Sequence, residues 1–168
     1  MIENGLKKRF LELVNQHKVI IHKISRIYGD TPEDREDLFQ EILLNLWKGY
    51  PSFRGESKFS TWLYRITLNT CITLYRKKSR SPKTDSISDQ HRVIPDDINI
   101  VGNGEELRLL YSAIDKLDKL EKAIIILYLE EKSYEEIAEI VGITPNHTGV
   151  KISRIREKLR KYFKNENT

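Results

Sequence analysis

The sequence is poor in several residue types, and each scarcity excludes a class of protein. Cys71 is the only cysteine among the 168 residues, which excludes a disulfide framework and a zinc cluster built from cysteines. The longest unbroken apolar run, Ala123–Leu129, is far shorter than the roughly 20 residues that a membrane-spanning helix needs. The N-terminal segment MIENGLKKRFLELV mixes charges into its apolar positions, unlike a signal peptide. We therefore expect a soluble, cytoplasmic protein.

Residues that carry enzymatic chemistry are also sparse. The four histidines, at positions 17, 22, 91 and 147, lie far apart without metal-ligand spacing, and the chain has neither a P-loop nor a Gly-x-Ser-x-Gly motif. His17 falls on an apolar stripe, where a hydrogen-bonded core histidine is the commoner role, and Cys71 is typical of a packing residue. We expect that the chain is not an enzyme and has no catalytic residue, metal or cofactor; a small hydrolase is the alternative.

Charged residues are plentiful and unevenly distributed. The 29 Lys and Arg exceed the 25 Asp and Glu, which gives a net charge of +4 and an isoelectric point near 9.0. Acidic segments at 30–41 and 130–141 alternate with basic segments at 65–80 and 142–164. A merely soluble protein more often intersperses its signs. Two separate basic segments therefore indicate two contacts with one polyanion.

Apolar residues recur at helical spacing through most of the chain, and no segment alternates as a strand does. Three helices are expected in the first half, and cap and stop residues set their ends. The first helix ends at Gly29-Asp30 and carries an apolar stripe made of Leu6, Phe10, Leu13, His17, Ile20, Ile24 and Ile27. The second helix begins after Thr31-Pro32 and ends at Gly49-Tyr50-Pro51. The third helix runs from Ser60 or Thr61 to about Lys78.

Between residues 79 and 104, serine, proline and glycine break every period, and helical spacing resumes at Glu105. We therefore expect an all-α fold of two small helical domains, residues 1–78 and 105–168, joined by a flexible linker at 79–104.

The segment from Ser133 to Lys161 has the pattern of a helix-turn-helix. Ser133 and Glu136 form a capping box, Gly142 supplies the turn, and Thr144-Pro145 begins the second helix. Thr148, Ile152, Ile155 and Leu159 share the inward face of that helix, and Asn146, His147, Val150, Lys151 and Arg154 point away. Such polar and basic groups suit the reading of base edges and the binding of phosphates. A solvated basic helix in a small bundle is the alternative.

Aromatic and basic residues are interleaved along the third expected helix, as in Trp62, Arg65 and Tyr64. Aromatic rings stack on unpaired bases and basic groups neutralise phosphates. The preceding loop, FRGESKF, can hold an extruded base. From the residues alone, an alternative explains this helix at least as well: Trp62 belongs to an apolar core and the basic side chains are merely solvated.

Two segments resemble a known family. DREDLFQEILLNLW followed by FRGESKFSTWLYRITLNTCITLYRKK resembles the N-terminal domain of the extracytoplasmic-function (ECF) sigma factors of bacterial RNA polymerase, and IDKLDKLEKAIIILYLEEKSYEEIAEIVGITPNHTGVKISRIREKLRK resembles their C-terminal domain. The resemblance implies a factor that binds core RNA polymerase and directs promoter-specific transcription initiation. Its implied partners are core polymerase, promoter DNA as duplex and as nontemplate single strand, and an anti-sigma factor, without direct membrane insertion.

The resemblance also implies the site residues. Polymerase docking falls on Asp37, Leu38, Gln40 and Glu41; recognition and melting of the minus-ten element fall on Phe53, Arg54, Ser57, Lys58, Phe59, Trp62, Arg65, Asn69 and Arg76; recognition of the minus-thirty-five element falls on Asn146, His147, Val150, Lys151 and Arg154. Gly149 stands where many relatives have lysine, and Val150 where they have serine. Both departures bear on the base preference of the upstream contact and not on its docking mode.

A conventional helix-turn-helix repressor or activator is the alternative from another class. Its N-terminal half would sense a ligand or dimerise, and it would bind tightly to a palindromic site. That interpretation leaves the aromatic and basic third helix unexplained.

Overall fold

The computed structural model of the protein describes residues 2–80 and 104–166. In those residues the chain forms seven α-helices, one 3-10 helix and no strand, which confirms the expected all-α class. The chain divides into two compact units, Met1–Asp85 and Ser86–Thr168. The expected linker at 79–104 lies almost entirely outside the described residues, so its limits and its flexibility stay predictions.

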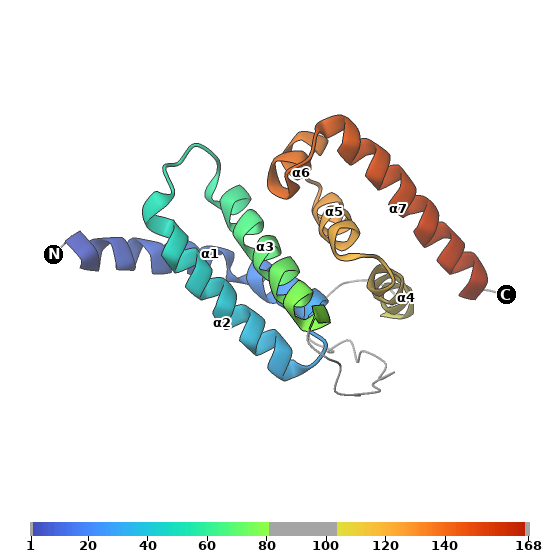
Figure 1. The fold of residues 1–168 in the computed structure, drawn as a ribbon, viewed down its shortest axis with the longest axis horizontal. Coiled ribbons are helices and arrows are strands. Elements are labelled where there is room, and N and C mark those ends of the chain that lie inside the picture. The colour runs from blue at the N-terminus through green and yellow to red at the C-terminus, as the bar shows by residue number, and fades with distance from the viewer. Residues whose placement is uncertain (1, 81–103, 167–168) are drawn as a thin grey trace. The chain divides into compact units, whose positions relative to one another are not determined.

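Unit 1, the first of these, contains three long helices (Figure 1). They are α1 (Ile2–Tyr28), α2 (Pro32–Gly49) and α3 (Phe59–Arg80), with a 3-10 turn, η1 (Tyr50–Ser52), after α2. The cap predicted at Thr31 is present: its hydroxyl accepts a hydrogen bond from Asp34 N at 3.1 Å, and Asp34 Oδ2 accepts one from Thr31 N at 3.3 Å. Each helix of the three packs against the other two.

The buried face of α1 differs from the expected stripe. Val14 and Ile21 are 7% and 0% exposed, whereas Leu6 is 37% exposed and Leu13 and Ile20 are only half-buried. Because α1 packs against both α2 and α3, its buried face is broader than one row of side chains. The predicted stripe was therefore wrong at Leu6 and incomplete between Phe10 and Ile24.

In the described residues, unit 2 is a bundle of three short helices and one long one, α7 (Figure 1). They are α4 (Gly104–Asp115), α5 (Lys119–Leu129), α6 (Tyr134–Val141) and α7 (Pro145–Glu166). Helix α5 is the centre of the bundle, since it packs against α6 and α7 and buries all the residues from Glu121 to Leu127. The inward face predicted for α7 is confirmed: Thr148, Ile152, Ile155 and Leu159 are at most 8% exposed.

The turn between α6 and α7 has the geometry that the sequence predicts. Ser133 and Glu136 exchange hydrogen bonds of 2.8 and 3.1 Å. Gly142 adopts a left-handed φ of 78° and donates its N–H to Ala138 O at 2.9 Å, which ends α6. His147 N donates to the Thr144 hydroxyl at 3.2 Å and so caps α7. These local bonds fix the entry of α7 into the bundle.

A second capping box begins α5. Asp118 and Glu121 exchange hydrogen bonds of 2.8 and 3.2 Å, and Glu121 also accepts one from Nζ of Lys158 on α7. Glu121 is 8% exposed. A buried carboxylate thus ties the start of α5 to α7.

No helix in the described parts of the chain is long and apolar enough to cross a membrane.

Candidate nucleic-acid and partner interfaces

The loop between η1 and α3 is closed at its base by aromatic rings. Phe53 and Phe59, at its two ends, lie edge to face with centroids 5.7 Å apart. The ring of Trp62 packs on both, at 5.1 Å from Phe53 and 5.4 Å from Phe59. Between the two phenylalanines, Gly55 takes a left-handed φ of 74° that lets the chain turn back. The loop is therefore a defined turn held by three rings.

Tyr50 lies beneath these rings and is only 8% exposed. Its ring centroid is 6.4 to 6.5 Å from those of Phe53, Phe59 and Trp62, and 5.2 Å from that of Phe10 on α1. Sequence reasoning treated Tyr50 only as part of a helix stop and missed this role. The aromatic cluster, defined as Phe10, Trp47, Tyr50, Phe53, Phe59 and Trp62, joins the loop to the core of unit 1.

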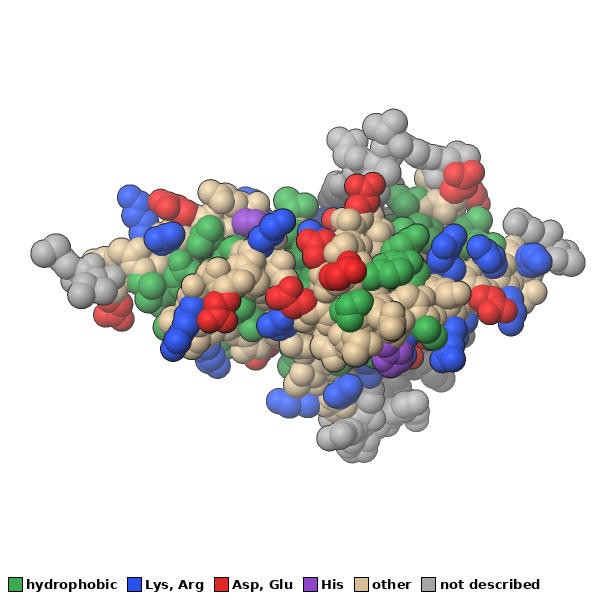
Figure 2. All heavy atoms as spheres, turned by 90° about the horizontal axis from the view of Figure 1, so that it is seen from above, with side chains coloured by type: hydrophobic (Ala, Val, Ile, Leu, Met, Phe, Trp, Pro, Cys, Tyr) green, Lys and Arg blue, Asp and Glu red, His purple; other side chains and the backbone are tan. Residues whose placement is uncertain are grey.

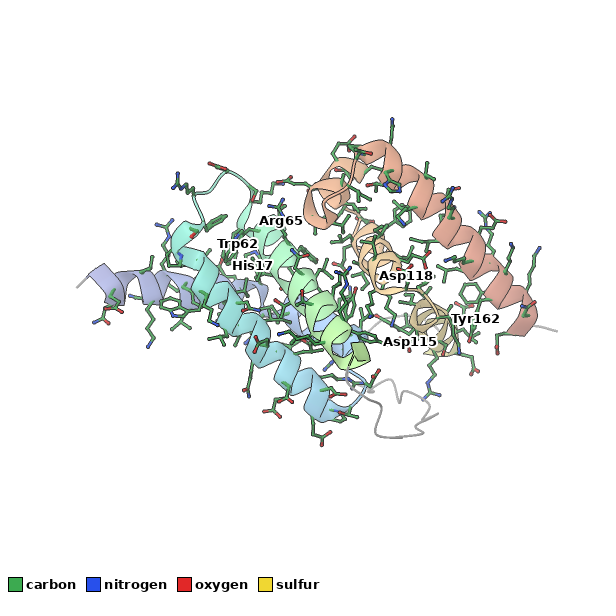
Figure 3. The ribbon with its side chains drawn as sticks, viewed as in Figure 1. His17, Trp62, Arg65, Asp115, Asp118 and Tyr162 are labelled. Carbon is green, nitrogen blue, oxygen red and sulfur yellow. The ribbon has the colours of Figure 1, made fainter. Side chains whose placement is uncertain are left out.

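His17 adds a contact from α1 to the same loop. Its ring lies 5.3 Å from that of Phe59, and its Nδ1 is 2.8 Å from the carbonyl oxygen of Leu13. The expectation of a hydrogen-bonded packing histidine is therefore confirmed. Figure 3 labels His17, Trp62 and Arg65 in this region, where α3 begins.

The expected minus-ten residues lie on the loop and on α3. Arg54 and Lys58 are exposed at the loop and Ser57 is half-buried. On α3 the spacing of 3, 4 and 7 residues places the remaining members on one helical face, because 3.6 residues make one turn; these are Trp62, Arg65, Asn69 and Arg76. Phe53, Phe59 and Trp62 are half-buried. These three rings therefore both pack with one another and keep part of their surface open.

The expected docking residues lie on α2. Asp37 and Gln40 are exposed, and Leu38 and Glu41 are half-buried. Leu44, one turn after Gln40, is 45% exposed and extends this face with an apolar side chain that sequence reasoning missed. The face therefore combines carboxylates, an amide and leucines.

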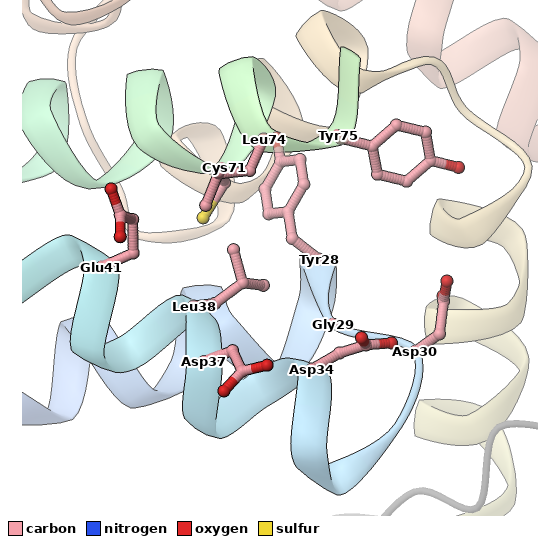
Figure 4. A pocket seen from close by; sticks show the side chains of 10 residues that line it. All are labelled: Tyr28, Gly29, Asp30, Asp34, Asp37, Leu38, Glu41, Cys71, Leu74 and Tyr75. Carbon is pink, nitrogen blue, oxygen red and sulfur yellow. The ribbon is translucent and has the colours of Figure 1, made fainter. Parts of the chain in front are cut away.

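A groove of about 230 Å³ opens beside this face, between the end of α1, α2 and α3 (Figure 4). Its floor is apolar and its rim is acidic. The lining residues are Tyr28, Gly29, Asp30, Asp34, Asp37, Leu38, Glu41, Cys71, Leu74 and Tyr75. Three of the four expected docking residues thus lie at one groove, and Gln40 lies outside it.

Cys71 is 1% exposed at the floor of this groove. Burial raises the pKa of its thiol to about 12, although a backbone hydrogen bond acts in the opposite direction. The thiol therefore stays protonated at neutral pH, as expected of a packing residue rather than a nucleophile.

The expected upstream-reading residues all lie on α7. Asn146, His147, Val150 and Arg154 are exposed, and Lys151 is half-buried. Further basic residues follow toward the end of the helix, and Figure 2 shows Lys and Arg side chains (blue) gathered where α7 ends. The structure thus brings the five residues together on one face, within the first ten residues of α7.

Gly149 lies on the flank of this face that turns toward α6. A Cβ atom at this position would be 3.4 Å from Cε2 of Tyr134, the first residue of α6. Tyr134 is itself 41% exposed. An aromatic ring thus covers the backbone of α7 where a longer side chain would otherwise project.

Two family models match the chain in succession. The Sigma-70 region 2 model matches residues 13–81, and the Sigma-70, region 4 model matches residues 107–159. The chain is 32% identical over 171 residues to the ECF RNA polymerase sigma-E factor of Escherichia coli (strain K12), covering 93% of this chain and 87% of that protein. It is 31% identical over 153 residues to the ECF RNA polymerase sigma factor SigG of Mycobacterium tuberculosis; the match covers 76% of this chain and 41% of that longer protein.

The fold also matches a solved structure, that of the sigma factor RpoE in complex with the anti-sigma factor NepR from Bartonella quintana. The TM-score is 0.70 at 22% sequence identity, and the match covers 95% of this chain and 97% of the other. At that identity the likeness shows a shared fold.

Proposed function

Because this chain belongs to the ECF RNA polymerase sigma factors, which direct transcription initiation and are not enzymes, we propose that it binds core RNA polymerase and contacts two promoter elements through its two units. The region 2 match spans the loop and α3, and the region 4 match spans the helix-turn-helix. The observation that carries the proposal is the pair of separate surfaces, each suited to a different state of DNA.

The α2 face is the proposed polymerase contact. Asp37, Leu38, Gln40 and Glu41 form its centre, and Leu44 extends it. Apolar side chains supply buried area in such a contact, whereas its charges set register and association rate more than affinity. A partner helix with apolar and basic residues fits this acidic, half-apolar surface.

The loop and the exposed face of α3 are the proposed minus-ten contact. Exposed Arg54 and Lys58 suit phosphates, and the aromatic cluster holds the loop in a defined turn that can receive one unpaired base. Stacking on an aromatic side chain contributes roughly 1–3 kcal/mol per base. Asn69 and Arg76 extend the same surface along α3, so that the neighbouring nucleotides of the nontemplate strand follow the helix.

The α7 face is the proposed duplex contact at the minus-thirty-five element. Asn146 and His147 offer hydrogen-bonding groups at the start of α7, which is the part of the recognition helix that contacts base edges in helix-turn-helix proteins, and Arg154 extends the same face along the helix. Lys151 suits a phosphate. A single unit of this size contacts few phosphates, so we expect weak and strongly salt-dependent DNA binding without core polymerase.

The proposed linker, residues 79–104, joins the two contacts. When a tether presents both units to one promoter, the second contact forms at a high effective concentration, and the two affinities reinforce each other. We also propose that the chain works in the cytoplasm, where RNA polymerase acts, and that an anti-sigma factor restrains it, as the solved RpoE–NepR complex suggests.

The test is transcription in vitro with core polymerase on a library of genomic fragments, with the start sites identified by sequencing. We expect start sites that share an upstream and a minus-ten motif. The double variant Lys58→Ala/Asn69→Ala should impair promoter opening and leave binding of the upstream duplex nearly intact. An equal loss of both activities would show that the two surfaces are assigned wrongly.

A further inference from the structure

The centre of the α7 face is apolar. Val150 is 48% exposed, and the residues one turn before and after it, Asn146, His147 and Arg154, are exposed polar or basic side chains. Its side chain therefore points where the hydrogen-bonding groups of the face also point. Because α7 contributes Thr148, Ile152, Ile155 and Leu159 to the core of unit 2, packing within the unit does not account for a valine on the opposite, exposed side of the helix.

Beside Val150, α7 carries no side chain at Gly149, and the ring of Tyr134 on α6 covers this flank of the face. The ring of Tyr134 lies against the backbone there, at 3.4 Å from the place of an absent Cβ. A valine reaches only a short distance from its helix axis, so it contacts a base only when the backbone comes close to the groove floor. No long side chain of α7 projects from the neighbouring position, Gly149, to hold the helix away from the groove.

Base edges in the major groove present hydrogen-bond donors and acceptors, and one apolar group, the 5-methyl group of thymine. A valine has no hydrogen-bonding group in its side chain. If it faced a polar base edge, it would remove water from that edge without replacing the lost hydrogen bond, which is unfavourable. The methyl group of thymine is therefore the group in the major groove that an apolar valine side chain can contact without the loss of a hydrogen bond.

We infer that Val150 is a specificity-determining residue that reads the 5-methyl group of a thymine in the upstream element. This inference rests on the proposed function of α7 as the reader of that element. It assigns to the chain a preference that serine at the same position would not confer. Burial of one methyl group predicts about fourfold tighter binding than to the same DNA without it.

The experiment uses the chain assembled with core polymerase. Selection from a library of duplexes with a randomised upstream segment first gives the preferred element. Each thymine of that element is then replaced by uracil, one at a time, and the Kd is measured by fluorescence anisotropy. Uracil keeps the hydrogen-bonding pattern of thymine and lacks only the methyl group. We expect one position at which uracil weakens binding about fourfold.

Two variants test whether Val150 causes the weaker binding of the uracil-containing duplex. Val150→Ser should remove the difference between thymine and uracil at that position. Val19→Ser, the matched control, changes a valine that is 72% exposed on α1 and should leave the difference intact. At the same position, 5-methylcytosine should bind more tightly than cytosine to the wild-type protein and equally to Val150→Ser.

Each outcome decides the inference. If the assembly binds its element and uracil is tolerated at every position, the inference is overturned and the proposed function stands. The inference is also overturned if Val150→Ser keeps the difference between thymine and uracil. If the assembly binds its selected element no better than a scrambled duplex, the proposed function itself fails.

Discussion

Among single residues, Cys71 shows how burial controls reactivity. It is 1% exposed, and burial raises the pKa of its thiol to about 12. Since the thiolate is the form that reacts, we expect iodoacetamide at pH 8 to leave the native protein almost unmodified. Addition of denaturant should raise the alkylation rate to that of an unhindered thiol. Mass spectrometry over time measures both rates, and rapid modification of the native protein would contradict the burial of this side chain.

Two glycines should respond to the same substitution in opposite directions. A Cβ atom at Gly29 would lie 2.6 Å from Cγ of Arg35 and 2.9 Å from the carbonyl oxygen of Ser25, so Gly29→Ala forces a shift of packed atoms. We expect it to lower the free energy of unfolding of unit 1 by about 1–3 kcal/mol. Gly149→Ala meets the Tyr134 ring at ordinary contact distance, and should stabilise α7 by up to about 1 kcal/mol.

Denaturant unfolding of both glycine variants, followed by circular dichroism, provides the measurement. Each substitution serves as the control for the other, because both add one methyl group to the same chain. A loss of stability in Gly149→Ala would show that the contact with Tyr134 is tighter than the structure indicates.

At the level of helices and turns, the sequence predicts the helix caps, which depend on neighbouring residues, but not the contacts between different helices. The caps at Thr31, Ser133 and Thr144 depend on residues within one turn, so spacing alone predicts them. Asp118 and Glu121 have the same spacing as Ser133 and Glu136, so the sequence also contains the signal for the capping box that begins α5. The partner of Glu121 on α7, Lys158, follows it by 37 residues, and no local pattern reveals such a pairing.

The same distinction applies to the candidate site. The five residues of the α7 face share one helix, so their grouping followed from helical geometry. The groove beside α2 draws Tyr28, Leu38 and Leu74 from three different helices, and the burial of Tyr50 depends on rings from α1, the loop and α3. These features arise from the packing of elements that are distant in sequence.

The turn before α3 gives a prediction about its aromatic support. Tyr50→Leu removes the ring on which Phe53, Phe59 and Trp62 rest, and we expect about tenfold weaker capture of a nontemplate single strand by the polymerase-bound protein, since stacking depends on ring placement. Tyr50→Phe keeps the ring and should retain capture. Binding of fluorescent single-stranded DNA measures the effect, and equal loss in both variants would indicate that the hydroxyl group, not the ring, matters.

For the molecule as a whole, the two units have separate cores. Ile21, Ile42 and Leu63 are 0% exposed in unit 1, as are Ile124 and Ile155 in unit 2. We therefore expect fragments 1–80 and 104–168 each to unfold cooperatively on heating. The second fragment should be the less stable, because a domain of about 60 residues buries a smaller share of its surface.

Circular dichroism of the two fragments and of the full chain checks this expectation. Ile155→Ala in fragment 104–168 is the control, and it should abolish or markedly lower the transition, as the loss of a buried isoleucine costs about 2–5 kcal/mol. A fragment 104–168 that melts without a cooperative transition would mean that unit 2 needs the rest of the chain to fold.

The isolation of Cys71 inside unit 1 also makes the protein convenient for fluorescence work. A single substitution such as Glu56→Cys, at an exposed position of the loop, creates one accessible thiol in an otherwise native background. A maleimide dye coupled there would sit beside the nucleotides that the loop is proposed to receive. Its emission would then follow strand separation at a promoter in real time, without prior removal of a packed side chain.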